Sequence, residues 1–483
     1  MSDDKTDVVI IGAGLSGIGA ACHLVRNSPD TRYIILESRK SLGGTWDLFR
    51  YPGVRSDSDM HTLGYSFKPW RSKNTIADGH SILKYIYETA VEYGVDKHIR
   101  FGQRVSKAEW NSTRQHWTLT LRNTLGAKTF LKCIFINSCT GYYKYDEPYC
   151  PSFEGLEEFK GRFVHPQFWP SNLDYKKKRV VVIGSGATAV TMAPAMAKLA
   201  SHVTMLQRSP TYIVSTPAVD PTAELLRRSV PHSVADVITR WRYIVTQMMM
   251  YQFSRRFPRY VKNKLIKWVR LQIDDCCDVE THFNPSYKPW DQRLCIVPDG
   301  DLFNGIRRGE ISVVTQQISN FTKDGVRLAS GDELKADIIV SATGLKMLPL
   351  GGISFLVDEV MIDLSQCIGF RGVMLSGLPN MIVSVGYTNA SWTLKVDLIN
   401  EYFCRLKRFM GHKGFRSFCV VNQPAASETE PLLDFSSSYV RRSIDKFPRQ
   451  GRNAPWRLYH NYILDIVTLK FSSFKHPGLR FYK

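Results

Sequence analysis

The chain has 483 residues, of which 43% are hydrophobic and 12% aromatic, so it can form two or three well-packed domains and is not typical of a disordered or fibrous protein. Its longest apolar runs are shorter than the ~18 residues of a membrane-spanning helix, and its acidic N-terminus is unlike a signal peptide, so we expect a cytoplasmic protein. The formal net charge of +20 raises nucleic acid as a partner, but the chain has no recognition motif or basic repeat, so we expect no nucleic-acid binding.

The first predicted elements are a strand, a glycine-rich turn and a helix. A β-branched run at residues 7–11 leads into Gly12-Ala13-Gly14-Leu15-Ser16-Gly17 and a stretch typical of a helix. Such a turn lets a backbone approach a pyrophosphate, whose charge the helix N-terminus favours. The next strand, at residues 33–36, is followed by Glu37, where a carboxylate would bind a ribose hydroxyl. We therefore predict a first dinucleotide site, formed by Gly12, Gly14, Ser16, Gly17 and Glu37.

The segment at residues 43–57 interleaves glycine, aromatic and charged residues, and Pro52-Gly53 predicts a turn within it. By composition alone it is an ordinary loop.

Between residues 99 and 136 the pattern becomes that of β-strands, with a polar turn at 111–115. The last of these strands ends in Cys139-Thr140-Gly141, and a later strand at 337–340 ends in Ala342-Thr343-Gly344. We interpret these two endings as the points where the chain leaves the first dinucleotide domain and returns to it.

Residues 159–170, FKGRFVHPQFWP, lie between two glycine-rich turns. Phe159 and Trp169 are expected to be apolar anchors, and Gly161 permits a tight bend. By residue type alone, His165 is either an ordinary loop histidine or a hinge contact.

A second strand, turn and helix follow. The strand at 179–183 leads into Gly184-Ser185-Gly186-Ala187-Thr188-Ala189, in which alanine takes the place of the third glycine. The next strand ends in Gln207-Arg208-Ser209, so the acid of the first site is missing and a guanidinium able to bind a 2′-phosphate takes its place. This arrangement predicts a site for NADPH rather than NADH, formed by Gly184, Ser185, Gly186, Ala187, Thr188, Ala189, Val190, Arg208 and Ser209.

A basic stretch comes next, with eleven Lys and Arg residues and one acid, Asp236, between residues 227 and 270. Two interpretations stay open. The stretch is an amphipathic helix on an anionic membrane surface, or it is a helical insert that packs on its own domain and has a charged outer face. Arg240 and Arg242 lie outside the apolar stripe, whose members are Val237, Trp241, Ile244, Val245, Met248 and Tyr251.

The ten cysteines include no C-x-x-C pair, and Cys276 and Cys277 are adjacent, so we expect reduced, buried thiols and no metal site. The missing dithiol also argues against a flavin disulfide reductase.

Arg293 follows Trp290 and Asp291, and by composition it could belong to a surface ion pair that contributes little to stability.

Two segments resemble signatures of the Baeyer–Villiger (class B) flavoprotein monooxygenases. The spacing F-x-G-x-x-x-H-x-x-x-W-P is complete at 159–170, and G-G-x-W-x-x-x-x-Y-P-G-x-x-x-D is present at 43–57. The order of segments along the whole chain is similar to a subgroup that oxidises thioamide prodrugs. The resemblance implies an α/β fold with two Rossmann-like domains, for FAD and NADPH, and a helical insertion. On this basis, residues 1–149 and 345–483 form the FAD domain, 150–217 and 290–344 the NADPH domain, and 218–289 the basic helical insertion.

The resemblance also implies roles for single residues. Asp57 is the acid that reaches the active site, Arg293 stabilises the flavin peroxide, and His165 couples domain movement to catalysis. Arg55, Ser56 and Asp57 lie near the nicotinamide cofactor, and Val105 meets the adenine end of FAD. Gln292 stands where family members often carry lysine, which removes one expected cofactor contact. The residues expected along the flavin are Thr45, Trp46, Asp47 and Leu48.

The implied activity is an NADPH- and O2-dependent monooxygenation through a C4a-peroxyflavin. It would convert ketones to esters by Baeyer–Villiger oxidation and would oxygenate the sulfur of thioamides and sulfides. The alternative is an N- or S-oxygenating flavin monooxygenase without Baeyer–Villiger activity. The expected partners are a small ketone or thioamide and O2, with peripheral membrane association left open.

Overall fold

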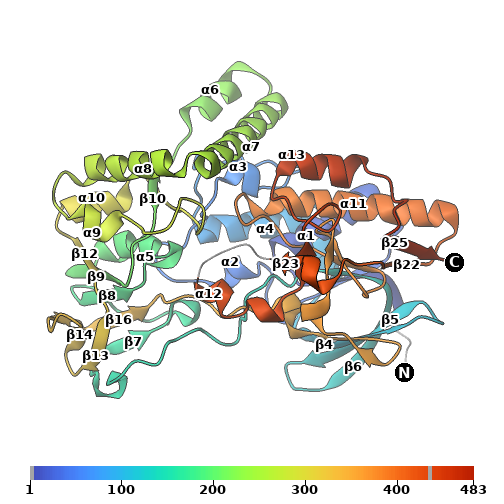
Figure 1. The fold of residues 1–483 in the computed structure, drawn as a ribbon, viewed down its shortest axis with the longest axis horizontal. Helices are drawn as coiled ribbons and strands as arrows, with labels where there is room; N and C mark the ends of the chain where they lie inside the picture. Colours follow the sequence, from blue (N-terminus) through green and yellow to red (C-terminus); the bar gives the residue numbers. More distant parts are fainter. Residues whose placement is uncertain (1–4, 433–437) are drawn as a thin grey trace.

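The structure, a computed structural model, describes residues 5–432 and 438–483. It contains two separate sheets with a Rossmann-like turn in each, and the helices of the insertion run along one edge of the molecule (Figure 1). The α/β fold with two dinucleotide-binding domains is therefore confirmed. The expected domain limits stay a prediction.

The first sheet has nine strands in the order β18-β17-β4-β5-β6-β1-β2-β3, and β21 also pairs with β6. Its centre is parallel because β1 pairs with both β2 and β6 in the same direction, whereas β4, β5 and β6 form an antiparallel meander. The predicted strand at 33–36 is confirmed residue for residue, and the strand predicted at 7–11 is found two residues longer, as β1. The strands are β1 (Lys5–Ile11), β2 (Tyr33–Leu36), β3 (Ile99–Arg100), β4 (Gln103–Asn111), β5 (His116–Asn123), β6 (Lys128–Ser138), β17 (Ser354–Val357), β18 (Val360–Met361) and β21 (Met381–Val383).

One face of this sheet is covered by long helices from both ends of the chain. Helices α1 (Leu15–Asn27), α4 (Gly79–Glu92) and α11 (Trp392–Lys413) share one large hydrophobic core with the sheet. The C-terminal part of the chain thus returns to the first domain, and its N-terminal strand and helix are buried by residues far away in sequence. Smaller elements between these are α2 (Thr45–Leu48), α3 (Met60–Leu63), α12 (Ser438–Arg441), α13 (Tyr462–Asp465), η1 (Val95–His98), η4 (Pro349–Gly352), η5 (Leu364–Gln366), η6 (Ala426–Glu428), η7 (Ile444–Lys446), η8 (Ile466–Phe471), β19 (Gly369–Phe370), β20 (Met374–Leu375), β22 (Ser417–Val420), β23 (Thr429–Pro431), β24 (Arg449–Gly451) and β25 (Leu479–Tyr482).

The second sheet has five strands, all parallel, in the order β12-β9-β8-β16-β7. Helices α5 (Ala187–Ala197) and α10 (Asp301–Arg307) cover one face, and a small antiparallel sheet covers the other. The predicted strand at 179–183 is confirmed as β8. The strands are β7 (Arg162–Val164), β8 (Arg179–Ile183), β9 (His202–Gln207), β12 (Ile311–Thr315), β13 (Ile318–Thr322), β14 (Gly325–Leu328), β15 (Glu333–Lys335) and β16 (Ile338–Ser341), with η2 (Leu156–Glu158) before β7 and η3 (Pro166–Phe168) after it.

Two chain segments connect the sheets, and they pair with each other. The outgoing linker follows β6 and the returning linker follows β16, and Tyr143 and Met347 form an antiparallel bridge between them. Lys144 N donates to Lys346 O, and Leu348 N donates to Tyr142 O, both at 2.9 Å. The two predicted crossover points therefore lie side by side at the boundary between the halves.

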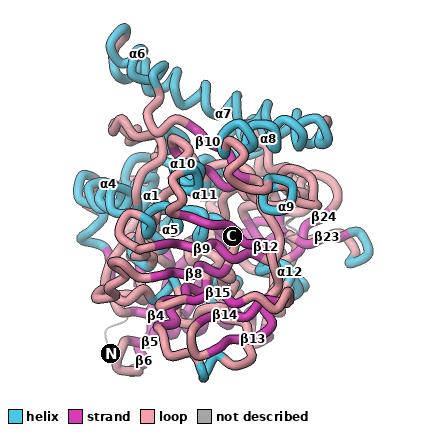
Figure 2. The backbone as a smooth tube through the Cα atoms, turned by 90° about the vertical axis from the view of Figure 1, so that its left-hand side faces the viewer, coloured by secondary structure: helices cyan, strands magenta, loops and turns pink. Residues whose placement is uncertain are grey.

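The basic insertion is helical, as predicted. It consists of α6 (Pro221–Ser229), α7 (His232–Arg256), α8 (Pro258–Ile273) and α9 (Val279–Phe283), and β10 (Ile213–Thr216) and β11 (Cys295–Pro298) pair where the chain enters and leaves it. Figure 2 shows α6, α7 and α8 lying above the strands of the second sheet. Within the described residues, no helix is both long and apolar enough to cross a membrane.

The structure corrects two details of these expectations. The outer face of α7 is mainly apolar and is basic only in the last turn, at Arg255 and Arg256, because Arg240 and Arg242 bind inward to Gly64 and Asp220 while Trp241 is exposed. The cysteines are free thiols, but not all are buried, since Cys150 and Cys276 are exposed.

Candidate active site

The turn between β1 and α1 is packed so tightly that only glycine fits at two of its positions. Gly12 has φ +106°, and a Cβ there would lie 2.6 Å from Cys139 O; a Cβ on Gly17 would lie 1.8 Å from Gly12 O. Glu37 is buried at the end of β2, where Oε2 accepts from Ala13 N at 2.8 Å and Oε1 accepts from Arg39 N at 2.9 Å. The carboxylate therefore holds the turn in place beside the ribose position that the sequence predicted for it.

A long cavity runs along this turn. One part, of about 690 Å³, is lined by Gly12, Glu37, Leu48 and Val105. A second part, of about 270 Å³, is lined by Trp46, Asp57, Thr188 and Arg293. The two parts share five lining residues, Gly14, Gly44, Cys139, Tyr143 and Tyr145. A carboxylate at one end, a helix N-terminus in the middle and an aromatic wall at the other end fit the ribose, pyrophosphate and ring of a dinucleotide.

The segment after β2 forms the wall of the cavity. Gly43 and Gly44 have positive φ and begin the short helix α2. Asp47, buried, pairs with Arg39 and Arg50, both at 2.7 Å. Thr45 and Trp46 line the second part of the cavity, and the Thr45 hydroxyl lies 3.1 Å from the Tyr145 hydroxyl. Asp47 therefore anchors the wall through two arginines, while its neighbours face the cavity.

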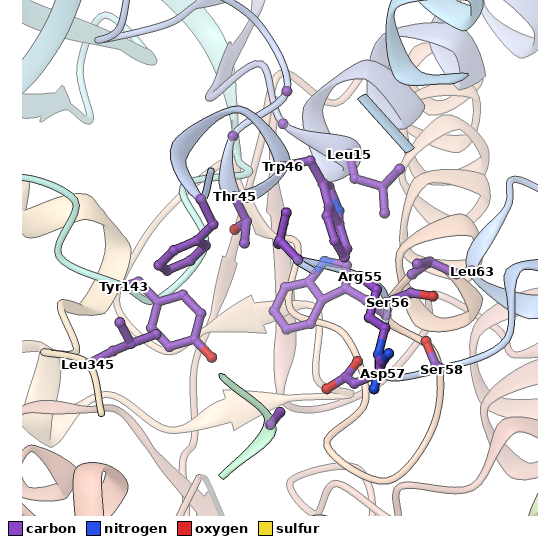
Figure 3. A pocket seen from close by; sticks show the side chains of 18 of the residues that line it. Leu15, Thr45, Trp46, Arg55, Ser56, Asp57, Ser58, Leu63, Tyr143 and Leu345 are labelled. Carbon is purple, nitrogen blue, oxygen red and sulfur yellow. The ribbon is translucent and has the colours of Figure 1, made fainter. Parts of the chain in front are cut away.

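The three residues at 55–57 join the two halves of the molecule. Arg55 Nη1 donates to Asp301 Oδ2 at 2.5 Å, and Asp301 is the first residue of α10 in the second domain. Ser56 is buried, and its hydroxyl accepts from Ala77 N. Asp57 Oδ2 lies 2.9 Å from Arg293 Nη1, and both side chains are 37% exposed. Figure 3 shows Trp46, Arg55, Ser56 and Asp57 on one side of the cavity and Tyr143 and Leu345, from the two linkers, on the other.

Arg293 belongs to the second half of the molecule, two residues before β11. Its neighbour Cys295 is buried, and this burial raises the pKa of the thiol to about 12, so the thiol stays neutral. The Arg293–Asp57 pair is thus a cation and an anion contributed by different halves and directed into a cavity that both halves line.

The second glycine turn repeats the first. Gly184 has φ +145°, and a Cβ there would lie 2.4 Å from Ala342 O, which corresponds to Cys139 O at the first turn. Gly186 precedes α5 and has open space around it, whereas Ala189 and Val190 are buried residues of the helix itself. Gly186 and Ala187 are exposed and Ser185 and Thr188 are half-buried, so the N-terminus of α5 is open to an anion.

At the end of β9, Gln207 turns inward and Arg208 turns outward. The Gln207 amide donates to His282 O at 2.8 Å and to the Thr315 hydroxyl at 2.9 Å. Arg208 and Ser209 are exposed. At the end of β9 an exposed guanidinium therefore takes the place of the carboxylate that follows β2.

His165 does not line the cavity. Its Nδ1 accepts from Gln167 N at 3.1 Å, so the proton is on Nε2, which donates to Tyr149 O at 3.2 Å. Burial lowers the pKa of this imidazole, so it is neutral near pH 7.

In the same segment, glycine is required at position 161, because a Cβ on Gly161 would lie 2.5 Å from Asp337 O.

Comparison with known proteins now identifies the family. Residues 5–366 match the family model described as flavin-binding monooxygenase-like. The chain is 49% identical over 481 residues to the FAD-containing monooxygenase EthA of Mycobacterium tuberculosis, covering 99% of this chain and 98% of that protein. The chain belongs to the flavin-binding monooxygenase-like family. It is therefore an enzyme, a flavin monooxygenase.

Other relatives agree with this assignment. The probable FAD-binding monooxygenase AlmA of an Acinetobacter species is 46% identical over 483 residues, covering 100% of this chain and 97% of that protein. Among solved structures, a steroid monooxygenase bound to NADP aligns with a TM-score of 0.75 and 21% identity, over 99% of this chain and 100% of that chain. A cyclohexanone monooxygenase aligns with a TM-score of 0.73 and 19% identity, over 99% and 100%. At these identities the structural likenesses establish the fold.

Three residues of this flavin monooxygenase were not predicted from the sequence. Asp301 holds Arg55, and Gln167 donates to Lys144 O and Tyr145 O in the outgoing linker. Arg442 lies over the Tyr149 ring, 3.5 Å from its centroid, and burial together with the charge of Arg208 lowers the pKa of Arg442. Gln167 occupies a variable position of the 159–170 pattern, and no sequence pattern marks Asp301 or Arg442.

Proposed function

We propose that this flavin monooxygenase uses FAD, NADPH and O2 to convert ketones to esters by Baeyer–Villiger oxidation and to add oxygen to the sulfur of thioamides and sulfides. The observation that carries the proposal is the ion pair between Arg293 and Asp57 in a cavity lined by both halves. FAD, when bound and reduced by NADPH, supplies the activation of O2. The protein's own residues bind the two cofactors, orient them and stabilise charge.

The two glycine turns account for cofactor binding. At the first, the N-terminus of α1 and the Glu37 carboxylate suit the pyrophosphate and ribose of FAD. At the second, the open N-terminus of α5 and the Arg208 guanidinium suit the pyrophosphate and 2′-phosphate of NADPH. Gly14 of the first turn, Thr188 of the second turn and Arg293 line the same part of the cavity, so both cofactor sites would open toward Arg293.

Arg293 stabilises the negative charge that develops on oxygen when a carbonyl group is attacked. A fixed cation in a partly enclosed cavity interacts with such charge more strongly than it would in bulk water. Asp57 holds the guanidinium by a hydrogen-bonded ion pair at 2.9 Å and so reduces the number of orientations that it can adopt. Hydride transfer to the flavin forms no anionic oxygen, so that step does not need Arg293.

The first test is Arg293→Ala. This variant should retain FAD and still be reduced by NADPH, but it should lose roughly 10²–10³-fold in ester formed, the cost of removing one oxyanion-type donor. Stopped-flow flavin absorbance and mass spectrometry of the products measure the two halves of the cycle separately. Arg293→Lys should rescue little, because lysine lacks the planar fork that Asp57 orients.

Arg308→Ala is the matched control, since Arg308 forms an exposed ion pair with Glu310 on the surface. Normal ester formation by Arg293→Ala would show that another residue stabilises the charge. An unmodified protein that gives S-oxides but no ester from any ketone would instead favour the S-oxygenating alternative.

A further inference from the structure

Helix α7 lies on the protein with its polar side inward. Asp236, Thr239 and Ser254 are buried against the body of the molecule. Arg240 Nη1 donates to His61 O at 2.9 Å and to Gly64 O at 2.8 Å, and Gln247 donates to Asp59 Oδ2 at 2.5 Å. Hydrogen bonds and ion pairs therefore attach most of the helix, and Ile244, which packs against Tyr387 and Leu394, adds an apolar contact.

The apolar side of α7 faces outward. Its residues recur at helical spacing and are each between 40% and 66% exposed, although a surface helix normally buries this stripe. So many exposed apolar residues on one helix face mark an interaction site. This exposed stripe consists of Val234, Val237, Ile238, Trp241, Val245 and Met249, whereas Ile244, a member of the predicted stripe, is buried.

The apolar surface continues onto the neighbouring helices. Trp241 contacts Tyr462 of α13, with ring centroids 6.0 Å apart. Helices α7, α8 and α13 run along the same edge of the molecule (Figure 1). We call this surface the docking face; beyond α7 its exposed apolar residues are Tyr260, Trp268 and Leu271 of α8 and Ile463, Leu464, Val467 and Phe471 of α13 and η8.

The charge next to the docking face is positive. Five basic side chains of the insertion are exposed and form no ion pair with any described residue: Arg228, Arg256, Arg259, Lys264 and Lys267. Arg256 lies over the Phe257 ring and Lys264 over the Tyr260 ring, at 5.7 Å and 5.5 Å from the centroids. Aromatic rings beside basic groups at the edge of an apolar surface suit the boundary between lipid headgroups and acyl chains.

We propose that the docking face binds the surface of an anionic phospholipid bilayer. The apolar residues of α7 and α13 enter the acyl boundary, and the unpaired basic residues contact the lipid phosphates. A second copy of the chain fits less well, because it would bring the same unpaired cations together. The docking face does not include the Arg293 cavity, so its binding can be measured without NADPH or substrate.

The experiment is flotation of the full-length, FAD-loaded protein with vesicles of phosphatidylglycerol and phosphatidylcholine, compared with phosphatidylcholine alone. We expect binding to the anionic vesicles and release as the ionic strength rises past about 0.15 M, where the screening length is about 8 Å. Failure to bind anionic vesicles at low salt, or equal binding to neutral vesicles, would overturn the proposal.

Two variants and two controls locate the surface. Val237→Glu with Met249→Glu, and separately Lys264→Glu with Lys267→Glu, should each reduce the bound fraction at least about tenfold. The controls are Val360→Glu with Met361→Glu, exposed apolar residues on β18, and Lys176→Glu with Lys178→Glu, exposed lysines before β8. Equal losses in the controls would contradict the assignment. A dimer in light scattering that Val237→Glu with Met249→Glu converts to a monomer would show that a second copy covers this face.

Discussion

Arg208 and Arg442 come from distant parts of the sequence, yet the charge of Arg208 adds to burial in lowering the pKa of Arg442. Two neighbouring cations repel each other, and an anion placed between them removes that repulsion. The ribose 2′-phosphate of NADPH is such an anion. Because Gln292 stands where family members often carry lysine, Arg442 is suited to supply the second cation.

Arg208→Ala and Arg442→Ala should each weaken binding of 2′,5′-ADP by about ten- to a hundredfold, since each loses a charge-assisted contact of roughly 1.5–3 kcal/mol. Binding of 5′-AMP should stay the same. Calorimetric titration of both nucleotides measures this without turnover. The control is Arg441→Ala, the exposed arginine next in sequence. If the unmodified protein binds the two nucleotides equally, this hypothesis is wrong.

Between elements, the contact of α3 with α7 depends on a neutral histidine. His61 is buried on α3, and its ring lies against Tyr243 of α7 with centroids 5.2 Å apart. Burial and the charges of Arg227, Arg242 and Arg240 lower the pKa of His61 to about 4, although Asp220 opposes them. As the pH falls, His61 therefore takes up a proton near pH 6.5 in the unfolded chain but only near pH 4 in the folded chain.

The free energy of unfolding should consequently fall as the pH drops from about 6.5 to about 4, and His61 should account for up to roughly 3 kcal/mol of that fall. His61→Phe keeps a ring against Tyr243 but cannot titrate, so this component should be absent. Chemical denaturation of both proteins at pH 7 and pH 5 measures the difference. Parallel pH dependences would show that another group is responsible.

For the molecule as a whole, the two halves meet at Tyr149. Its carbonyl oxygen accepts from His165 Nε2 and from the Thr343 hydroxyl, both at 3.2 Å. The outgoing linker, the 159–170 segment and the returning linker are therefore joined at one atom. His165 lies outside the cavity, so any effect that it has on catalysis must pass through the positions of the halves.

His165→Ala should slow flavin reduction by NADPH by up to about a hundredfold, because small displacements of a reacting group are costly. The affinity for NADP+ should change little. Stopped-flow absorbance and calorimetry separate the two effects. His202→Ala is the control, since His202 bonds the Ser312 hydroxyl within the second sheet. If the flavin of the His165→Ala variant is reduced at the normal rate, His165 stabilises only its own loop.

Much of the fold follows from local sequence. The strands at 33–36 and 179–183 were predicted to the residue, because β-branched runs that end at glycine or acid turns adopt this conformation through their own sterics. The glycine turns follow for the same reason, since only glycine adopts φ +106° and +145° beside a carbonyl group. Asp57 and Arg293 were each assigned to the active site through family resemblance, and nothing local in the chain would have joined them.

Only the tertiary structure decided which residues meet across the chain. Arg55 binds Asp301, and Arg442 lies near Arg208, because folding brings together segments that no sequence pattern connects. Helix α7 illustrates the physical reason. Its sequence determines that Val237, Trp241 and Val245 share one face, but periodicity does not determine which face turns inward. That choice depends on distant partners, the Gly64 carbonyl and the Asp220 carboxylate, which bind Arg240 and Arg242 and leave the apolar face exposed.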